Sequence, residues 1–388
     1  MTKKVASDLG MGPNVLVTGG NFKNQGAFLM LVAAGIAVRD YLGGRPVIPL
    51  RFGTARQRID IGYETLLAEE RFGVRPRLPQ LPRRARDHSP YLFTGDIDAV
   101  LDVTGFAFGD QWYNAPLMRR AQNYEWWASR GVPVVMLPQA FGPFELTGEP
   151  SRRAISASSA VYPRDETSFK HVEGLLGAAS HRRMARYPDF TVKVPARKPE
   201  KLTIDEPYWC IVPNWNIYER ADKEDARRYV AGLVRVTRFI GALGGRAVGV
   251  CHEGARDLEL LQEVKREYTE LELVSGLNGL ELKFVLGRAQ GVVSGRYHAI
   301  ISALSQGVPT VMHGWSHKYS WLAADFGWDG NCVSPFDGGD ATIDLLNSYA
   351  EAREEMSKSL ILSTEKVHSV NLAMWREVAQ ILEVEDRI

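Results

Sequence analysis

Short apolar runs and longer helical patterns alternate along the first half of this chain. Short runs of three to seven mainly apolar residues predict buried strands, and apolar residues spaced by three and four predict helices between them. The expected strands are 14–18, 46–52, 98–104, 132–138 and 161–163, and the expected helices are about 27–42 and 115–130. Strands that alternate with helices in this way indicate a parallel sheet covered on both faces.

A second alternation follows a stretch of proline and charge at 195–207, which is typical of a linker. Its expected strands are 208–213, 246–251, a short one near Leu273, 290–293 and 309–312. Its expected helices are 223–243, 255–268, 296–306, about 340–360 and 364–382. The pattern therefore predicts two Rossmann-like α/β domains, 1–200 and 207–388, with the strand ends of both facing a shared cleft.

The most informative stretch is 280–327, where a strand ends at Ser294-Gly295 and a helix begins at Arg296. Arg296 and His298 thus stand at a strand end and a helix N-terminus, where amide N–H groups and the helix dipole suit an anion. His317 and Lys318 follow the next strand, and two strand ends that both carry basic groups favour an anionic ligand. The alternative is structural: a histidine satisfied under a loop and a solvated arginine.

Two loops of the first domain also carry chemistry. Asn21, Asn24, Gln25 and Gly26 lie in a glycine-rich loop between a strand and a helix, which suits a phosphate cradle or an ordinary connection. Arg164 ends another strand, and Asp165 or Thr167 is expected to cap the helix that follows. A capping role explains Asp165 better than it explains Arg164.

Composition narrows the functional classes. The 388 residues carry a formal net charge of +1, which argues against nucleic acid as a partner. Three cysteines without CxxC spacing predict neither a metal site nor a disulfide framework, and no apolar run suggests a signal peptide or a membrane span. We therefore expect a cytoplasmic protein. The arginine-rich stretch 71–86 is expected to be a solvated loop, or alternatively to approach an anionic acceptor or the inner membrane surface.

Read together and in order, several fragments resemble the polysaccharide pyruvyl transferase family. They are GGNFKNQGA, DVTGFAFGD, LPQAFGPF, YPRDETSF, PDF at 188–190, and VVSGRYHAIISALSQGVPTVMHGWSHKYSWLAADFG. The resemblance spans about residues 14–327, and its most specific parts are Arg-x-His, the GVP that follows, and Lys318. It implies a glycosyltransferase-B-like fold and transfer of a pyruvyl group from phosphoenolpyruvate to a sugar, usually as a ketal, in polysaccharide biosynthesis for the cell envelope.

The sequence departs from the family pattern at two places. The first loop has Asn24-Gln25-Gly26-Ala27 where an acid is common after the glycine, which affects the acceptor side. Tyr297 stands where leucine is more usual, and it would stack on a sugar or fill the same pocket.

The resemblance and the residue chemistry together suggest roles. His298 is the first choice for acid–base catalysis, and a carboxylate from Asp165, Glu166 or Asp189 would deprotonate the attacking hydroxyl. Arg296, Lys318 and Arg164 would hold the doubly anionic donor. Further expected substrate contacts are Asn21, Asn24, Gln25, Gly26, Gly295, Tyr297, His317 and His252. His252 lies beside Glu253 at a strand end, and the alternative for it is an ordinary core or loop histidine. We expect no metal and no cofactor, since phosphoenolpyruvate is itself a substrate.

Three functions remain open at this level. The first is the pyruvyl transferase, with a free, nucleotide-linked or lipid-linked sugar as acceptor. The second is a nucleotide-sugar-dependent glycosyltransferase, and the third is a non-catalytic sugar- or phosphate-binding relative. The sequence gives neither the acceptor sugar nor the oligomeric state.

Overall fold

The computed structural model describes residues 12–67, 91–112, 115–177, 183–202, 204 and 207–383. By their contacts, the described residues fall into two units. Within the described residues, unit 1 comprises 12–22, 30–190 and 370–383, and unit 2 comprises 23–29 and 191–369, apart from the gaps just given. The arginine-rich stretch 71–86 lies outside the described residues.

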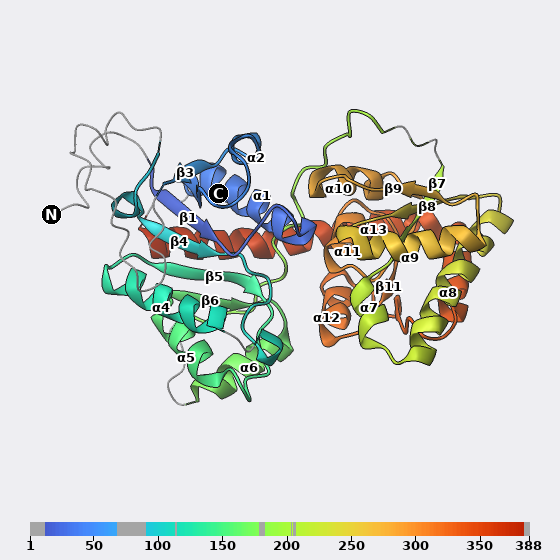
Figure 1. Ribbon diagram of the computed structural model, residues 1–388. Coiled ribbons are helices and arrows are strands. Elements are labelled where there is room, and N and C mark those ends of the chain that lie inside the picture. Colours follow the sequence, from blue (N-terminus) through green and yellow to red (C-terminus); the bar gives the residue numbers. More distant parts are fainter. Residues whose placement is uncertain are drawn as a thin grey trace. The chain divides into compact units, whose positions relative to one another are not determined.

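Unit 1 is built on a six-stranded parallel sheet with strand order β3-β2-β1-β4-β5-β6 among the described residues (Figure 1). Its elements are β1 (Asn14–Thr18), α1 (Gln25–Asp40), β2 (Arg45–Pro49), α2 (Ala55–Asp60), β3 (Glu64–Leu66), η2 (Thr94–Asp96), β4 (Ala99–Asp102), η3 (Asp110–Trp112), α4 (Ala115–Ser129), β5 (Val134–Gln139), α5 (Gly148–Ala157), β6 (Ala160–Pro163) and α6 (Glu166–Leu176). The central strands β4 and β5 are buried along their whole length, which explains why they are apolar except for a polar residue at the end of each.

Unit 2 repeats this architecture with strand order β12-β11-β10-β7-β8-β9, again six parallel strands among the described residues. Its elements are β7 (Tyr208–Val212), α7 (Trp215–Arg220), α8 (Lys223–Ala242), β8 (Arg246–Val250), α9 (Gly254–Glu267), β9 (Glu272–Val274), α10 (Gly279–Gly287), β10 (Val292–Ser294), α11 (Tyr297–Leu304), β11 (Thr310–His313), α12 (His317–Phe326), β12 (Cys332–Val333) and α13 (Asp340–Leu382). The prediction of two α/β parallel-sheet folds is confirmed.

Both sheets reverse their winding direction at one place, and this place matters for function. In unit 1 it lies between β1 and β4, and in unit 2 between β7 and β10. Ligands of doubly wound sheets bind beyond the carboxyl ends of the strands at this switch point. The residues just after β7 and β10 are therefore the first place to look for a site in unit 2.

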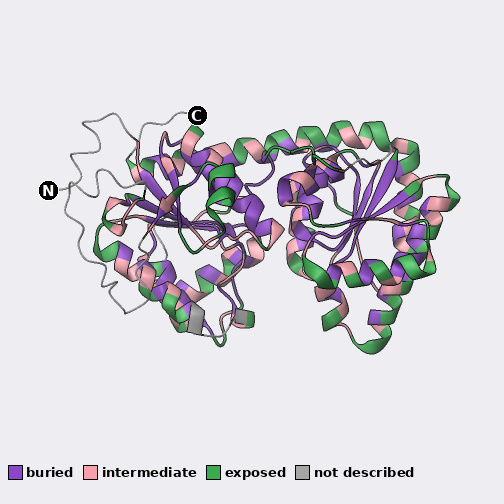
Figure 2. Ribbon diagram, turned by 45° about the horizontal axis from the view of Figure 1, so that its top comes forward, coloured by how far each residue is buried: buried purple, intermediate pink, exposed green. Residues whose placement is uncertain are grey.

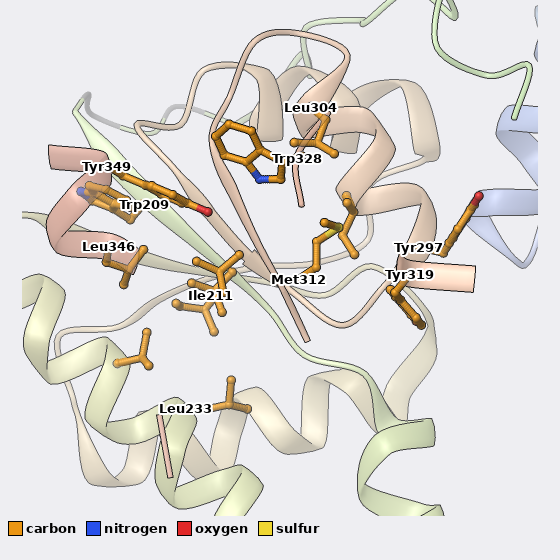
Figure 3. Close-up of a cluster of buried hydrophobic side chains, with 14 of the residues drawn as sticks. Trp209, Ile211, Leu233, Tyr297, Leu304, Met312, Tyr319, Trp328, Leu346 and Tyr349 are labelled. Carbon is orange, nitrogen blue, oxygen red and sulfur yellow. The ribbon is translucent and has the colours of Figure 1, made fainter. Parts of the chain in front are cut away.

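The core of unit 2 lies between the sheet and the helices that cover it (Figure 2). Figure 3 shows part of this core, with Tyr297 and Tyr319 next to each other; their ring centroids are 6.1 Å apart. Polar tips within this core have partners: Trp328 Nε1 donates to the carbonyl of Thr310 at 2.8 Å, and the Tyr349 hydroxyl donates to Asn331 Oδ1 at 2.6 Å. Satisfied polar tips let large rings be buried without loss of hydrogen bonds.

Helix ends follow the local sequence. Asp222 caps α8 by accepting from the backbone N–H groups of Glu224 and Asp225, both at 2.9 Å. Asn278 and Glu281 form a capping box at the start of α10. Such caps satisfy donors that the helix itself leaves unpaired.

Two helices contribute to both units, which a linear division at 200–207 did not anticipate. The first turn of α1 groups with unit 2, while the rest of that helix groups with unit 1. The helices expected at 340–360 and 364–382 form one element, α13, with non-helical backbone angles at Ala352. From Val370 onward α13 belongs to unit 1, where Trp375 packs near Tyr41 and Phe190.

Among the described residues, no helix has the length and apolar character needed to cross a bilayer.

Candidate functional site

The turn from β10 into α11 is fixed by hydrogen bonds from neighbouring elements. The carbonyl of Gly295 accepts from Asn214 Nδ2 and from the Tyr319 hydroxyl, each at 2.7 Å. Asn214 is the second residue after β7, so its bond to Gly295 spans the switch point of the sheet. A Cβ at position 295 would lie 2.6 Å from Ile217 Cδ1, and this close packing requires glycine there. The turn is therefore held in one geometry.

Arg296 leaves this turn as a buried charge, with 9% of its surface exposed. Its Nε donates to Asp257 Oδ2 at 2.8 Å, its Nη2 donates to Asp257 Oδ1, and its Nη1 donates to Glu253. Burial alone lowers the pKa of Arg296, and the two carboxylates more than offset this, so its pKa lies above the ordinary value. The fork predicted for an anionic ligand thus holds two carboxylates of the protein, leaving two of its five N–H groups outside these bonds.

Asp257 anchors the arginine from the first turn of α9. The residue is fully buried and also accepts from the backbone N–H groups of Trp215 at 3.0 Å and Glu253 at 3.1 Å. Four donors satisfy this carboxylate. Sequence reasoning missed Asp257, because an acid in the first turn of a helix ordinarily just complements the helix dipole.

The first loop packs onto the same place through residues that group with unit 2. Asn24 caps α1 by accepting from the N–H of Ala27 at 2.8 Å, and its Nδ2 donates to Glu253 Oε1. A Cβ on Gly26 would lie 2.8 Å from Cγ of His298 and closer still to Nδ1. The glycine of the first motif is therefore required by contact with the histidine of the last. Gln25 Nε2 donates to the carbonyl of Lys23 at 3.3 Å.

His252 completes this cluster. It is buried, with 4% exposed, and its Nε2 has no hydrogen-bond partner among the described residues. Burial, followed by the charges of Arg296 and His298, lowers the pKa of His252 to about 3. His252 is consequently neutral at physiological pH.

Lys318 lies among aromatic rings at the neighbouring strand end. Its Nζ is 4.9 Å from the ring centroid of Trp315, 5.3 Å from that of Tyr319 and 5.7 Å from that of Tyr297. Such contacts stabilise an ammonium group that is withdrawn from water. The neighbouring His317 is exposed at the start of α12.

The remaining predicted residues lie in unit 1. Asn21 follows β1, and Arg164 follows β6, where it is buried with Nη1 3.9 Å from Asp189 Oδ2. Asp165 caps α6 by accepting from the N–H of Ser168 at 2.7 Å, and Glu166 lies 3.8 Å from Lys170 one turn on. Both acids thus have local structural roles, as the capping alternative for Asp165 suggested.

A buried polar network at the switch point of unit 1 was not singled out from the sequence. The carboxylate of Asp102, at the end of β4, accepts from Thr104 N–H at 3.0 Å, from Thr104 Oγ1 at 3.1 Å and from Gln139 Nε2 at 3.2 Å. Arg120 lies 3.7 Å away. The fragments DVTGFAFGD and LPQAFGPF meet through these side chains.

A family model described as polysaccharide pyruvyl transferase matches residues 44–317, which is more than half of the chain. The chain belongs to the polysaccharide pyruvyl transferase family. This match includes Arg296, His298 and Asp102, whereas the first loop with Asn24 and Gly26 lies before it. Among curated proteins, no sequence matches this chain.

Solved structures show the same fold at low identity. A UDP-GlcNAc 2-epimerase from Neisseria meningitidis, bound to UDP-GlcNAc, has a TM-score of 0.55 and 11% identity over 93% of this chain and 100% of that one. The glycosyltransferase SnogD from Streptomyces nogalater has a TM-score of 0.52 and 16% identity, covering 95% and 99%. UGT89C1 from Arabidopsis thaliana, complexed with UDP, has a TM-score of 0.55 and 12% identity, covering 95% and 99%. These likenesses concern the fold, which is of the glycosyltransferase-B kind.

The close contact between Gly26 and His298 of the Arg-x-His motif can be tested by substitution. The change Gly26→Ala should lower the free energy of unfolding by about 1–3 kcal/mol, the usual cost of overpacking, because the added methyl group overlaps the His298 ring. Urea unfolding and the imidazole signals of His298 in NMR spectra measure both effects. Gly174→Ala is the matched control: its Cβ meets no atom within 4 Å inside α6, so it should stabilise by about 0.5–1 kcal/mol. Equal stability of Gly26→Ala and wild type, with an unshifted His298 signal, would contradict this packing.

The neutral state of His252 predicts a pH dependence of stability. At pH 5 an unfolded histidine, with a pKa near 6.5, binds about one proton, whereas His252 in the folded protein binds almost none. This histidine therefore contributes stability that is present above about pH 6.5 and is lost as the pH falls toward 3. His252→Gln should reduce the slope of unfolding free energy against pH by about 1.4 kcal/mol per pH unit near pH 5. Denaturant titrations between pH 4.5 and 6 measure the slope, and an unchanged slope would refute the assignment.

Proposed function

We propose that this protein transfers a pyruvyl group from phosphoenolpyruvate to a sugar of a polysaccharide or of its precursor, forming a ketal and releasing phosphate. Family membership supports the class of reaction. The observation that carries the site is the convergence of the Arg-x-His motif and the first loop: His298 packs on Gly26, while Glu253 joins Arg296 to Asn24. Residues more than 250 positions apart thus form one charged cluster at a switch point of the sheet.

The donor brings a carboxylate and a phosphate, and it therefore needs cationic partners. Lys318 and the Nη groups of Arg296, all in unit 2, are the proposed contacts. Lys318 extends from the first turn of α12, whose N-terminal amides also favour an anion. In this proposal phosphate departs toward these cations, and neither a metal nor a cofactor takes part.

His298 is the proposed acid–base group. Attack at C2 of phosphoenolpyruvate requires a proton at C3, and an imidazolium is suited to supply it near neutral pH. His252 is held neutral, so it is unsuited to the role of acid. A second hydroxyl of the acceptor then displaces phosphate and closes the ketal.

Asn21, Gln25, Tyr297 and His317 remain proposed contacts of the acceptor or donor. The acceptor is proposed to be an oligosaccharide or a nucleotide- or lipid-linked sugar, modified in the cytoplasm or at the inner face of the membrane during exopolysaccharide or cell-envelope synthesis. Nucleic acid is not a proposed partner.

A nucleotide-sugar-dependent glycosyltransferase is the second candidate, favoured by the fold shared with a glycosyltransferase and with a UDP-complexed enzyme. It would consume a UDP-sugar and ignore phosphoenolpyruvate. A non-catalytic relative would bind sugar or phosphate without turnover.

The reaction can be tested by incubating the protein with phosphoenolpyruvate and a panel of sugar acceptors. We expect phosphate release that depends on both substrates, together with a mass gain of the acceptor that matches a pyruvyl ketal. A parallel set with UDP-sugars covers the second candidate. Release of UDP, with no effect of phosphoenolpyruvate, would replace the proposal with the glycosyltransferase.

The variant His298→Gln should retain donor binding but slow turnover by about two to four orders of magnitude, the usual contribution of a positioned acid–base group. Calorimetric titration with phosphoenolpyruvate and the phosphate-release assay separate the two quantities. His368→Gln, on α13, is the control and should behave as wild type. Turnover of His298→Gln within a factor of about ten of wild type would remove His298 from the mechanism.

A further inference from the structure

Glu253 occupies an unusual position for a carboxylate. It directly precedes α9, yet its side chain makes no capping bond to that helix. Instead Oε2 accepts from Arg296 Nη1 and Oε1 accepts from Asn24 Nδ2. The Glu253 side chain is 31% exposed, so a ligand at the sheet edge can reach it.

The nearby Asp257, rather than Glu253, is the residue that anchors Arg296. Asp257 is fully buried, takes two bonds from Arg296 and is satisfied by four donors. With Asp257 in place, Arg296 remains paired even without Glu253. One acid therefore anchors the arginine, and the other points a partly exposed carboxylate into the cluster of His298 and Asn24.

The carboxylates considered from the sequence serve other contacts. Asp165 caps α6, Glu166 lies beside Lys170, and Asp189 is buried next to Arg164. All three belong to unit 1. Glu253, by contrast, bonds to Arg296 within unit 2.

A second observation marks this edge as a place for a ligand. The imidazole of His252, the residue before Glu253, is buried, and its Nε2 has no partner among the described residues. Buried polar atoms are normally satisfied, and an exception calls for a specific cause. A hydroxyl-rich ligand at this edge would provide the missing partner.

We propose that Glu253 is the general base that takes the proton from the attacking acceptor hydroxyl. This inference rests on the proposed pyruvyl transfer. Asn24 and Arg296 orient the carboxylate, and His298 acts as the complementary acid.

The proton balance closes with these two groups. In the first step the hydroxyl proton passes to Glu253, the C2–O bond forms, and the electrons of the C2=C3 bond take a proton from the His298 imidazolium. In the second step the other hydroxyl attacks C2, the C2–O bond to phosphate breaks, and neutral His298 takes the hydroxyl proton. Glu253 returns its proton to the departing phosphate. Both side chains end as they began.

The net charge of the cluster lets a substitution distinguish a general base from a carboxylate that only holds Arg296. Arg296, Asp257 and Glu253 together carry one net negative charge when all are ionised, and replacing Glu253 by glutamine removes it. If Glu253 is the general base, Glu253→Gln should lower kcat by about 10²- to 10⁴-fold, while phosphoenolpyruvate binds equally or more tightly. A carboxylate that merely held Arg296 would predict weaker phosphoenolpyruvate binding.

The experiment measures phosphate release by wild type, Glu253→Gln and the control Glu219→Gln, together with calorimetric binding of phosphoenolpyruvate. Glu219 is an exposed acid of α7 paired with Arg256, so its variant should match wild type. A large loss of kcat with undiminished donor binding supports the base. If wild type is active and kcat of Glu253→Gln lies within about tenfold of it, or if kcat and donor binding are lost together, Glu253 is not the general base. The proposed pyruvyl transfer would stand in either case. A wild type that shows no phosphoenolpyruvate-dependent turnover with any acceptor overturns both.

Glu253→Ala provides an independent arm, and circular dichroism checks its folding. Added formate should restore its turnover at least about tenfold by supplying a carboxylate in the vacated space, and a folded variant that formate does not rescue overturns the proposal. If neither variant folds, Glu253→Asp is used, which keeps the charge but shortens the side chain by one methylene. Turnover equal to wild type would show that Glu253 is not the base. A loss of turnover of about tenfold or more with intact donor binding would support the proposal.

Discussion

The buried ion pair of Arg296 with Asp257 is the interaction on which the site of unit 2 depends. Both groups are almost or fully withdrawn from water, and the arginine meets the carboxylate through two parallel bonds. Breaking a buried pair by removing one partner costs about 3–5 kcal/mol, because the remaining charge is left uncompensated. The pair links the end of β10 to the first turn of α9 and so fixes the neighbouring His298 and Glu253.

Close packing beside this pair explains why the motifs have small residues. Gly26 is small because His298 occupies the space beside it, and Gly295 is small because Ile217 and Asn214 do. Asn24 both caps α1 and contacts Glu253. Glycines and an asparagine that look like ordinary loop residues in the sequence are therefore parts of one packed cluster.

The two units use their switch points differently. In unit 2 the cluster contains an arginine, two acids and histidines, one of them held neutral by burial. In unit 1 the corresponding place carries the carboxylate of Asp102, bonded to Thr104 and Gln139. A Cβ on Gly19 would lie 2.7 Å from Asp102 Oδ1, so the glycine after β1 belongs to this second network. The same sheet topology thus carries an arginine paired with two acids in unit 2 and a hydrogen-bonded carboxylate in unit 1.

The sequence by itself determined the class of fold, most strand and helix positions, and the importance of 294–298, because apolar periodicity and glycine at strand ends are local signals. It also identified the family through motifs in order. Only the tertiary structure decided which residues meet: Asp257, the partner of Arg296, carries no local signal, and α1 and α13 each contribute to both units. Side-chain pairing between strands distant in sequence depends on strand order and on the packing that selects it. A periodic pattern that repeats every two or four residues does not contain that information.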